Sequence, residues 1–139
     1  MLIEDDTDDQ EFFREALSRI GHATLYGIAQ NGKEALGILR DSHILPDLIF
    51  SDINMPVMNG IECLAELKTD PRFRRIPVII LSSAEEESII ASTLGARAFI
   101  NKQNSFNELC GQIGKCISED VVVAAGFPVV SHYALSSAA

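Results

Sequence analysis

The chain has 139 residues, of which 47% are hydrophobic and 22% charged, so it is long enough for one domain with a sizeable core and too short for two. Its formal net charge of −9 argues against direct binding to nucleic acid, which needs clustered Lys and Arg. The sequence has no apolar run of membrane-spanning length and no signal peptide pattern, so we expect no membrane association. Its three cysteines lack paired metal-ligand spacing and are expected to be reduced core thiols, which indicates the cytoplasm.

Short segments with strand and helix periodicity alternate along the chain. We expect strands at residues 2–3, 24–29, 47–52, 77–81 and 98–101. A helix is expected after each strand, with N-caps at Thr7, Asn31, Asn59, Ser83 and Ser105, of which Thr7 forms a capping box with Gln10 and Ser83 pairs with Glu86. This alternation predicts an α/β domain with a parallel sheet and right-handed crossovers.

Polar side chains follow four of the predicted strands, at the point where each strand ends. They are Glu4 and Asp5 after the first strand, Asp52 after the third, Ser82 after the fourth and Lys102 after the fifth. The carboxyl ends of parallel strands lie at one edge of a sheet, and open α/β sheets bind their ligands there. We therefore expect these side chains to meet.

Carboxylates this close repel one another, and a hard divalent cation with oxygen ligands would keep them ionised at neutral pH. Mg²⁺ is favoured because it binds one or two carboxylates and keeps positions open for phosphate oxygens. A carboxylate such as that of Asp52 can attack a phosphoryl group, while the metal and Lys102 neutralise charge on its oxygens. Ser82 has a hydroxyl that can donate a hydrogen bond to the same group.

Several motifs also occur in a specific order and at specific spacings. They are Ile3-Glu4-Asp5-Asp6, Asp52-Ile53-Asn54-Met55-Pro56 followed by Gly60, Leu81-Ser82-Ser83-Ala84, and Gly95-Ala96 leading to Phe99 and Lys102. On these motifs the chain resembles the receiver domain of two-component response regulators, of the stand-alone, chemotaxis-regulator type. The match covers residues 1–118, and the tail at 119–139 is expected to be disordered or to bind a partner. The resemblance implies a flavodoxin-like (βα)5 fold, a doubly wound parallel sheet with strand order 2-1-3-4-5.

The resemblance implies that Asp52 is the phosphoacceptor. Its phosphoryl group would come from the phosphohistidine of a sensor histidine kinase or a phosphotransfer protein. Asp5 and Asp52 would bind Mg²⁺ directly, with the backbone carbonyl of Asn54 as a further ligand and Glu4 acting through water. Lys102 would contact the phosphate. Such a protein is not an enzyme with a separate substrate, because it catalyses only its own phosphorylation and dephosphorylation.

Ser82 and Phe99 would form the switch that reports phosphorylation. Ser82 would move toward the phosphate and Phe99 would turn inward, which changes the surface of the fourth helix, fifth strand and fifth helix. We expect this surface to contact a downstream protein target, in a monomer or in a homodimer formed through it. Segments 6–9 and 70–77 further resemble receivers that serve phytochrome-type and other sensor kinases. Gln103 stands where the family usually has a proline in a cis peptide, and a non-proline cis bond costs about 3 kcal/mol.

Other interpretations remain open from the sequence. The acids at 4–6 could only cap the first helix against its dipole, Ser82 could be a cap, Lys102 could be a solvated surface residue, and Phe99 could be a core residue. A pseudo-receiver would bind partners without phosphorylation, but it is expected to have lost one of the site residues. A phosphohydrolase of the haloacid dehalogenase kind would normally have a second acid where this chain has Asn54.

Overall fold

The computed structural model describes residues 1–124, with side chains up to residue 118. Within these residues a five-stranded parallel sheet has the order β2-β1-β3-β4-β5, so the predicted fold class and strand order are confirmed. The strands are β1 (Leu2–Ile3), β2 (Ile28–Ala29), β3 (Ile49–Asp52), β4 (Val78–Ser82) and β5 (Ala98–Asn101). The helices are α1 (Thr7–Ile20), α2 (Gly32–Asp41), α3 (Gly60–Thr69), the 3₁₀ turn η1 (Glu85–Glu87), α4 (Ser88–Thr93) and α5 (Phe106–Ala124).

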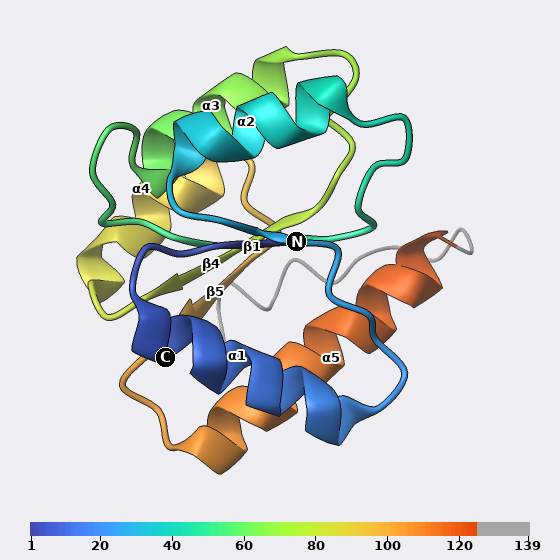
Figure 1. Cartoon of the computed structure of the whole chain (residues 1–139). Helices are drawn as coiled ribbons and strands as arrows, with labels where there is room; N and C mark the ends of the chain where they lie inside the picture. The colour runs from blue at the N-terminus through green and yellow to red at the C-terminus, as the bar shows by residue number, and fades with distance from the viewer. Residues whose placement is uncertain (125–139) are drawn as a thin grey trace.

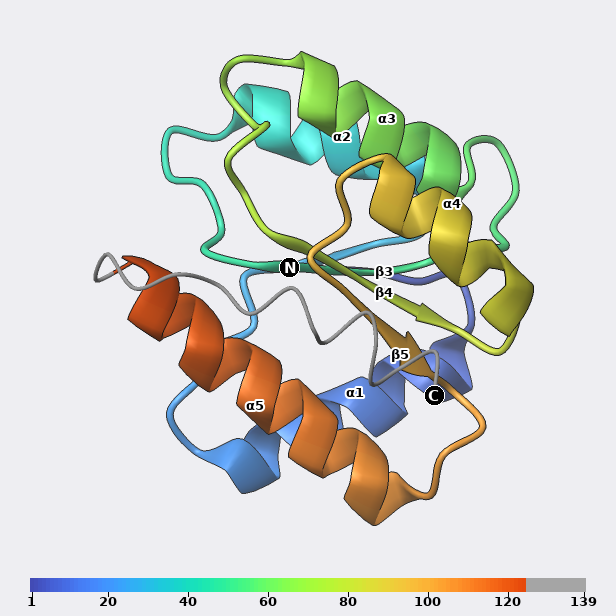
Figure 2. The same cartoon turned by 180° about the vertical axis from the view of Figure 1, so that it is seen from behind.

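Helices cover both faces of the sheet, as Figures 1 and 2 show: α1 and α5 pack on one face, and α2, α3 and α4 on the other. Successive strand residues point to opposite faces, and because both faces are covered, consecutive residues are apolar, as in Val-Ile-Ile-Leu of β4. In β4, Ile79 packs in the core under α1 and α5, whereas Ile80 packs in the core under α2 and α3. The sheet is therefore buried from both sides.

The first helix begins differently from the prediction. Asp6, and not Thr7, is its N-cap, because the Asp6 carboxylate accepts hydrogen bonds from the backbone N–H groups of Asp8 (2.8 Å) and Asp9 (3.0 Å). The predicted capping box is therefore wrong. The negative charge of Asp6 also lies at the positive end of the helix dipole, so one of the three acids at 4–6 does have a capping role.

The second strand is shorter than predicted. Only Ile28 and Ala29 pair, in register with the two residues of β1, although a strand over 24–29 was expected. The sheet order makes β2 an edge strand with β1 as its neighbour, and β1 is itself only two residues long. The backbone N–H groups of Leu2 and Glu4 donate to the carbonyls of Gly27 (3.0 Å) and Ala29 (2.9 Å) at the two ends of this short ladder.

The segment after β4 also departs from the prediction. Ser83 does not cap a helix; the chain forms the short turn η1 and then the six residues of α4, and neither has a side-chain cap. The hydroxyl of Ser82, one residue earlier, accepts the backbone N–H of Ala84 instead (3.1 Å). On α4, Ala91 is buried, while Ile89 and Ile90 are 75% and 53% exposed.

Three further expectations concern the ends and the cysteines. Helix α5 continues to Ala124, past the predicted end of the domain at 118, and the rest of the predicted tail, 125–139, lies outside the described residues. Cys63 and Cys116 are buried and Cys110 is half-buried, and burial raises the pKa of the Cys63 thiol to about 12. Among the described helices, none combines the length and the hydropathy that a membrane crossing would need.

Burial in the sheet gives a first prediction. Ile80 is 0% exposed in β4. The Ile80→Ala substitution should lower the free energy of unfolding by about 3 kcal/mol, because it leaves a cavity that the two packed faces cannot close. Ile89→Ala removes the same atoms from an exposed site and should cost less than about 0.5 kcal/mol. Urea denaturation measures both. Equal losses in the two variants would contradict the layered core described above.

Candidate functional site

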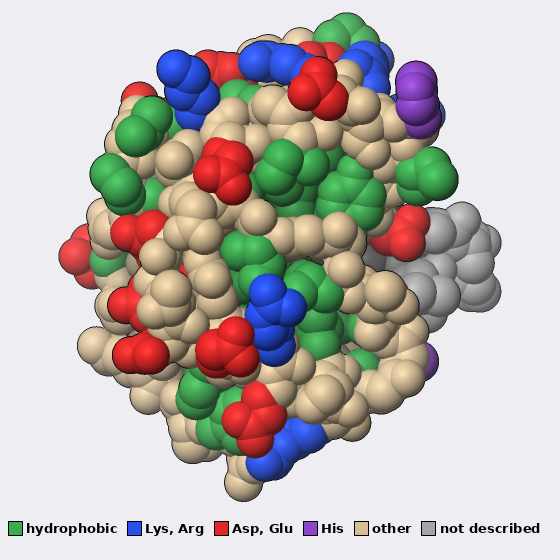
Figure 3. Space-filling model, in the orientation of Figure 1, with side chains coloured by type: hydrophobic (Ala, Val, Ile, Leu, Met, Phe, Trp, Pro, Cys, Tyr) green, Lys and Arg blue, Asp and Glu red, His purple; other side chains and the backbone are tan. Residues whose placement is uncertain are grey.

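Three acids meet at the carboxyl edge of the sheet. Strand register explains this, because Ile3 of β1 is paired with Ser51 of β3, so the next residues, Glu4 and Asp52, come side by side. Carboxylate oxygens of Glu4, Asp5 and Asp52 all lie within 4.8 Å of one another. Figure 3 shows Asp and Glu side chains gathered on the left of the molecule, at the end toward which the arrows of β4 and β5 point in Figure 1.

Two of these three acids are removed from water. Glu4 is 2% exposed and Asp52 is 9% exposed, whereas Asp5 is open to solvent. A buried carboxylate that stays ionised needs a cation or several hydrogen-bond donors. The structure supplies one such cation.

Lys102, in the turn after β5, extends its ammonium group into the cluster. Its Nζ lies 2.6 Å from Glu4 Oε1, 2.9 Å from Asp9 Oδ2 and 3.4 Å from Asp52 Oδ2. Its backbone N–H donates to the carbonyl of Ser82 (3.0 Å), which fixes the turn against β4. Lys102 is therefore not the solvated surface residue of the alternative interpretation.

The pKa shifts reflect burial and these contacts. Burial raises the pKa of Glu4 to about 7, the hydrogen bond from Lys102 opposes this, and the charge of Asp52 adds to it. Burial alone would lower the pKa of Lys102, but its hydrogen bonds to Glu4 and Asp9 outweigh that effect and raise it. One ammonium therefore faces the three carboxylates of Glu4, Asp9 and Asp52, and Asp5 lies beside Glu4 and Asp52, so the site has negative charge left over to attract a further cation.

The backbone around Asp52 is tightly held. Its Oδ1 accepts the backbone N–H of Ile53 (2.8 Å), and its carbonyl accepts the hydroxyl of Ser51 (2.8 Å). Gly60, at the start of α3, donates its N–H to the carbonyl of Ile53 (2.8 Å). A Cβ at Gly60 would collide with the carbonyl oxygen of Asp52. This contact explains why the motif requires glycine eight residues after Asp52.

The remaining predicted residues lie nearby. Ser82 is 1% exposed at the end of β4, and since its oxygen accepts the Ala84 N–H, its hydroxyl hydrogen is left to donate. Asn54 is exposed, two residues after Asp52. Phe99 is 1% exposed and belongs to the core under α2 and α3. The ring is thus already inside in this structure, and the expected switch role of Phe99 with Ser82 stays a prediction.

The peptide bond between Lys102 and Gln103 is at the position where the family usually has a cis proline. The described residues contain no cis peptide bond, so the Lys102–Gln103 bond is trans. The side chain of Asn101 turns toward this segment, where its Oδ1 accepts the backbone N–H of Gln103 (2.8 Å) and its amide donates to Glu85 (2.9 Å).

Sequence reasoning missed two residues on the first turns of α1. Asp9 accepts a hydrogen bond from Lys102 (2.9 Å). Gln10, which was assigned to a capping box with Thr7, is 8% exposed and donates from Nε2 to the backbone carbonyl of Glu4 (2.7 Å). The spacing indicates that both residues lie beside the strand end, because the first turns of a helix follow it directly, but it does not indicate the contact that either side chain makes.

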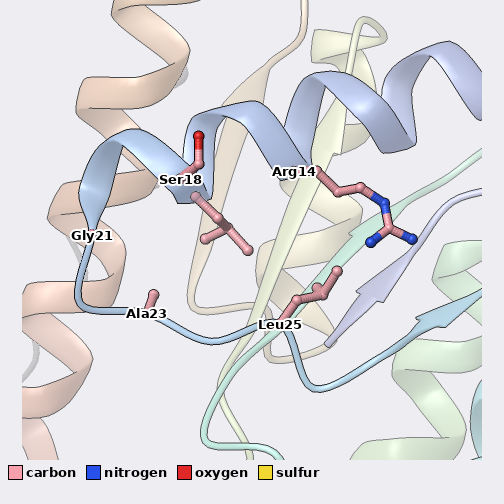
Figure 4. Close-up of a pocket in the computed structure, with 6 residues that line it drawn as sticks. Arg14, Ser18, Gly21, Ala23 and Leu25 are labelled. Carbon is pink, nitrogen blue, oxygen red and sulfur yellow. The ribbon is translucent and has the colours of Figure 1, made fainter.

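A hollow of about 350 Å³ lies elsewhere, between the end of α1 and the chain that leads to β2 (Figure 4). It is lined by Arg14, Leu17, Ser18, Gly21, Ala23 and Leu25. None of these residues is an acid, and the acids gather instead around the start of α1. The hollow is therefore separate from the cluster around Asp52.

Comparison with known proteins assigns the family. The model of the response regulator receiver domain matches residues 1–114. The chain belongs to this family. Among its relatives, the polar-differentiation response regulator DivK of Brucella ovis is 35% identical over 106 residues, which cover 73% of this chain and 81% of DivK. The probable transcriptional regulator ycf29 of Pyropia yezoensis is 36% identical over 88% of this chain, which spans about half (54%) of that protein's length.

Solved receiver structures have the same architecture. The phosphorylated cyanobacterial phytochrome response regulator RcpA is 33% identical, with a TM-score of 0.73 over 92% of this chain and 96% of RcpA. The bacteriophytochrome response regulator AtBRR is 32% identical, with a TM-score of 0.72 over 93% of each chain. The Mn²⁺-bound form of response regulator Rcp1 is 26% identical, with a TM-score of 0.70 over 92% of this chain and 96% of Rcp1.

Glu4 should make the stability of this receiver domain depend on pH. Its pKa rises from 4.5 to about 7 on folding, so the folded state holds the proton more tightly, and the free energy of unfolding should fall as pH rises between these values. The loss from this group is at most about 3 kcal/mol. Urea denaturation without divalent cations should show the loss in the wild type and not in Glu4→Gln.

Glu11→Gln is the matched control, because Glu11 is an exposed residue of α1 that forms a surface ion pair with Arg14. The free energy of unfolding of Glu11→Gln should change with pH in the same way as that of the wild type. If the free energy of unfolding of Glu4→Gln also fell from pH 5 to 7.5 by as much as that of the wild type, Glu4 would have no raised pKa.

Proposed function

We propose that this receiver domain accepts a phosphoryl group on Asp52 from the phosphohistidine of a sensor histidine kinase or a phosphotransfer protein, and signals by protein contact. The observation that carries the proposal is the position of Asp52. Its carboxylate lies at the carboxyl edge of the sheet, beside Glu4 and Asp5 and 3.4 Å from the ammonium of Lys102. This arrangement gives a nucleophile next to a fixed positive charge.

The donor set fits Mg²⁺. Carboxylate oxygens of three residues lie within 4.8 Å of one another, and Lys102 alone does not balance their charge. Asp5, Asp52 and the backbone carbonyl of Asn54 would hold the ion, with Glu4 acting through water. When bound, Mg²⁺ neutralises charge on the phosphoryl oxygens.

The protein's own residues would then have the following roles. Asp52 Oδ2, the oxygen on the Lys102 side, attacks phosphorus; the new O–P bond forms as the N–P bond to histidine breaks, and the electron pair stays on the imidazole nitrogen. Lys102 faces the charge on a phosphoryl oxygen. Ser82 donates its free hydroxyl hydrogen to the same group. Hydrolysis by water later restores the carboxylate.

Signal output is proposed to use the surface of α4, β5 and α5, in a monomer or in a homodimer. The exposed Ile89 and Ile90 of α4 support a protein contact there, because exposed apolar side chains gathered together favour binding. RcpA and AtBRR are described as phytochrome and bacteriophytochrome response regulators, which supports a kinase of that type as partner. A cytoplasmic location is part of this proposal.

The alternatives are less well supported. A pseudo-receiver would be expected to lack Asp52, Lys102 or an acid of the first pair, and this chain has all of them at one edge of the sheet. A phosphohydrolase of the haloacid dehalogenase kind would need an acid in place of Asn54. The phosphohydrolase also does not account for the match to the receiver-domain family.

The proposal predicts a single phosphoryl adduct. Intact-mass analysis after incubation with acetyl phosphate and Mg²⁺ should show one adduct on the wild type, because the Asp52 carboxylate is the positioned nucleophile. Asp52→Asn should show none, and EDTA should prevent the reaction. Asp47→Asn is the control, since Asp47 is an exposed acid before β3 and should react as the wild type does. A folded wild type without an adduct would overturn the proposal.

Metal binding gives a separate prediction. Mg²⁺ at ten times its Kd should raise the free energy of unfolding by about 1.4 kcal/mol, because the ion binds the folded site only. Asp5→Asn should lose most of this gain. Asp8→Asn removes the same charge from an exposed position on α1 and should keep the stabilisation by Mg²⁺. Thermal unfolding with and without Mg²⁺ measures the effect, and equal gains in both variants would place the ion elsewhere.

A further inference from the structure

Asp9 contacts the site without a role in the function proposed above. It lies on the first turns of α1, its side chain is 48% exposed, and its Oδ2 accepts a hydrogen bond of 2.9 Å from Lys102. The neighbouring Asp8 is also exposed, but within the described part of the chain the Lys102 ammonium forms ion pairs with Glu4, Asp9 and Asp52 and not with Asp8. Asp9 therefore differs from its neighbour by this one contact.

The geometry of the ammonium group suggests what that contact does. Lys102 has three N–H donors, and three carboxylate oxygens face them. Those of Glu4 and Asp9 lie at hydrogen-bond distance, 2.6 and 2.9 Å, whereas that of Asp52 lies farther away, at 3.4 Å. Two short contacts thus hold the ammonium, and its third N–H faces the reacting carboxylate.

We propose that Asp9 is a positioning residue for phosphoryl transfer, which anchors Lys102 from helix α1 so that one N–H of the ammonium faces the phosphoryl group on Asp52. This inference depends on the function proposed above. Glu4 makes the shorter contact (2.6 Å) but is also expected to face the metal through water. Asp9 adds a second carboxylate contact (2.9 Å), from helix α1.

If Asp9 anchors Lys102, neutralising Asp9 should change the phosphorylation rate in the direction opposite to a purely electrostatic effect. Removing an acid near a site that receives an anionic phosphodonor should by itself speed the reaction, since repulsion is reduced. Loss of an anchor should slow it, because the ammonium would no longer be held in place. A slower reaction after neutralisation of Asp9 therefore cannot come from charge alone.

The test compares Asp9→Asn with Asp8→Asn, which makes the same change of charge one residue away. With acetyl phosphate and saturating Mg²⁺, intact-mass kinetics should show Asp9→Asn reacting at least about fivefold more slowly than Asp8→Asn. Asp9→Glu, which keeps the carboxylate, should recover part of the rate. The Kd for Mn²⁺, measured by electron paramagnetic resonance, should agree within about twofold between the two Asn variants, because Asp9 is not a proposed metal ligand.

Several outcomes would overturn the inference. Asp9→Asn could react as fast as Asp8→Asn or faster, which would make Asp9 an ordinary surface acid. Its Mn²⁺ affinity could fall together with its rate, which would place its effect in the metal site. No adduct on the wild type and on Asp8→Asn would instead overturn the proposed function itself. Circular dichroism checks folding, which we expect to persist because Asp9 is half-exposed.

Discussion

The contact between Lys102 and the buried carboxylate of Glu4 is the interaction on which the carboxyl edge of the sheet depends. Without a cation, Glu4 and Asp52 would carry charge in a region with little water, and removing one partner of such a pair costs about 3–5 kcal/mol. Lys102 comes from the turn after β5 and Glu4 from the end of β1, so this contact links strands at opposite sides of β3 and β4. The sheet order makes it possible.

Binding sites of this kind combine stability and reactivity in one place. The Lys102 ammonium offsets the repulsion between acids in the resting protein, and the same positive charge would face an incoming phosphoryl group. The core on both faces of the sheet holds the strand ends rigid. The geometry of the site therefore depends on the packing of apolar residues that carry no reactive group.

Much of the fold could be predicted from sequence, because long apolar strands such as β4 and capped helices such as α3, with its Asn59–Glu62 capping box, have strong local signals. Local signals failed where tertiary structure decides. The length of β2 depends on its partner β1, and Gln10 binds the carbonyl of Glu4 rather than capping its own helix. The acid cluster could be predicted from the residues at the strand ends. The contact between Asp9 and Lys102 could not, because it depends on the path of the Lys102 side chain, which the spacing of residues does not show.

The close approach of Gly60 to Asp52 makes the surroundings of Asp52 asymmetric. On the α3 side there is no room for a methyl group, and the backbone N–H of Gly60 binds Ile53, so this side acts as a fixed wall. On the other side, η1 and α4 begin without a side-chain cap, and the hydroxyl of Ser82 makes one exchangeable bond to the Ala84 N–H. A displacement that starts at Asp52 should therefore meet less resistance toward η1 and α4 than toward α3.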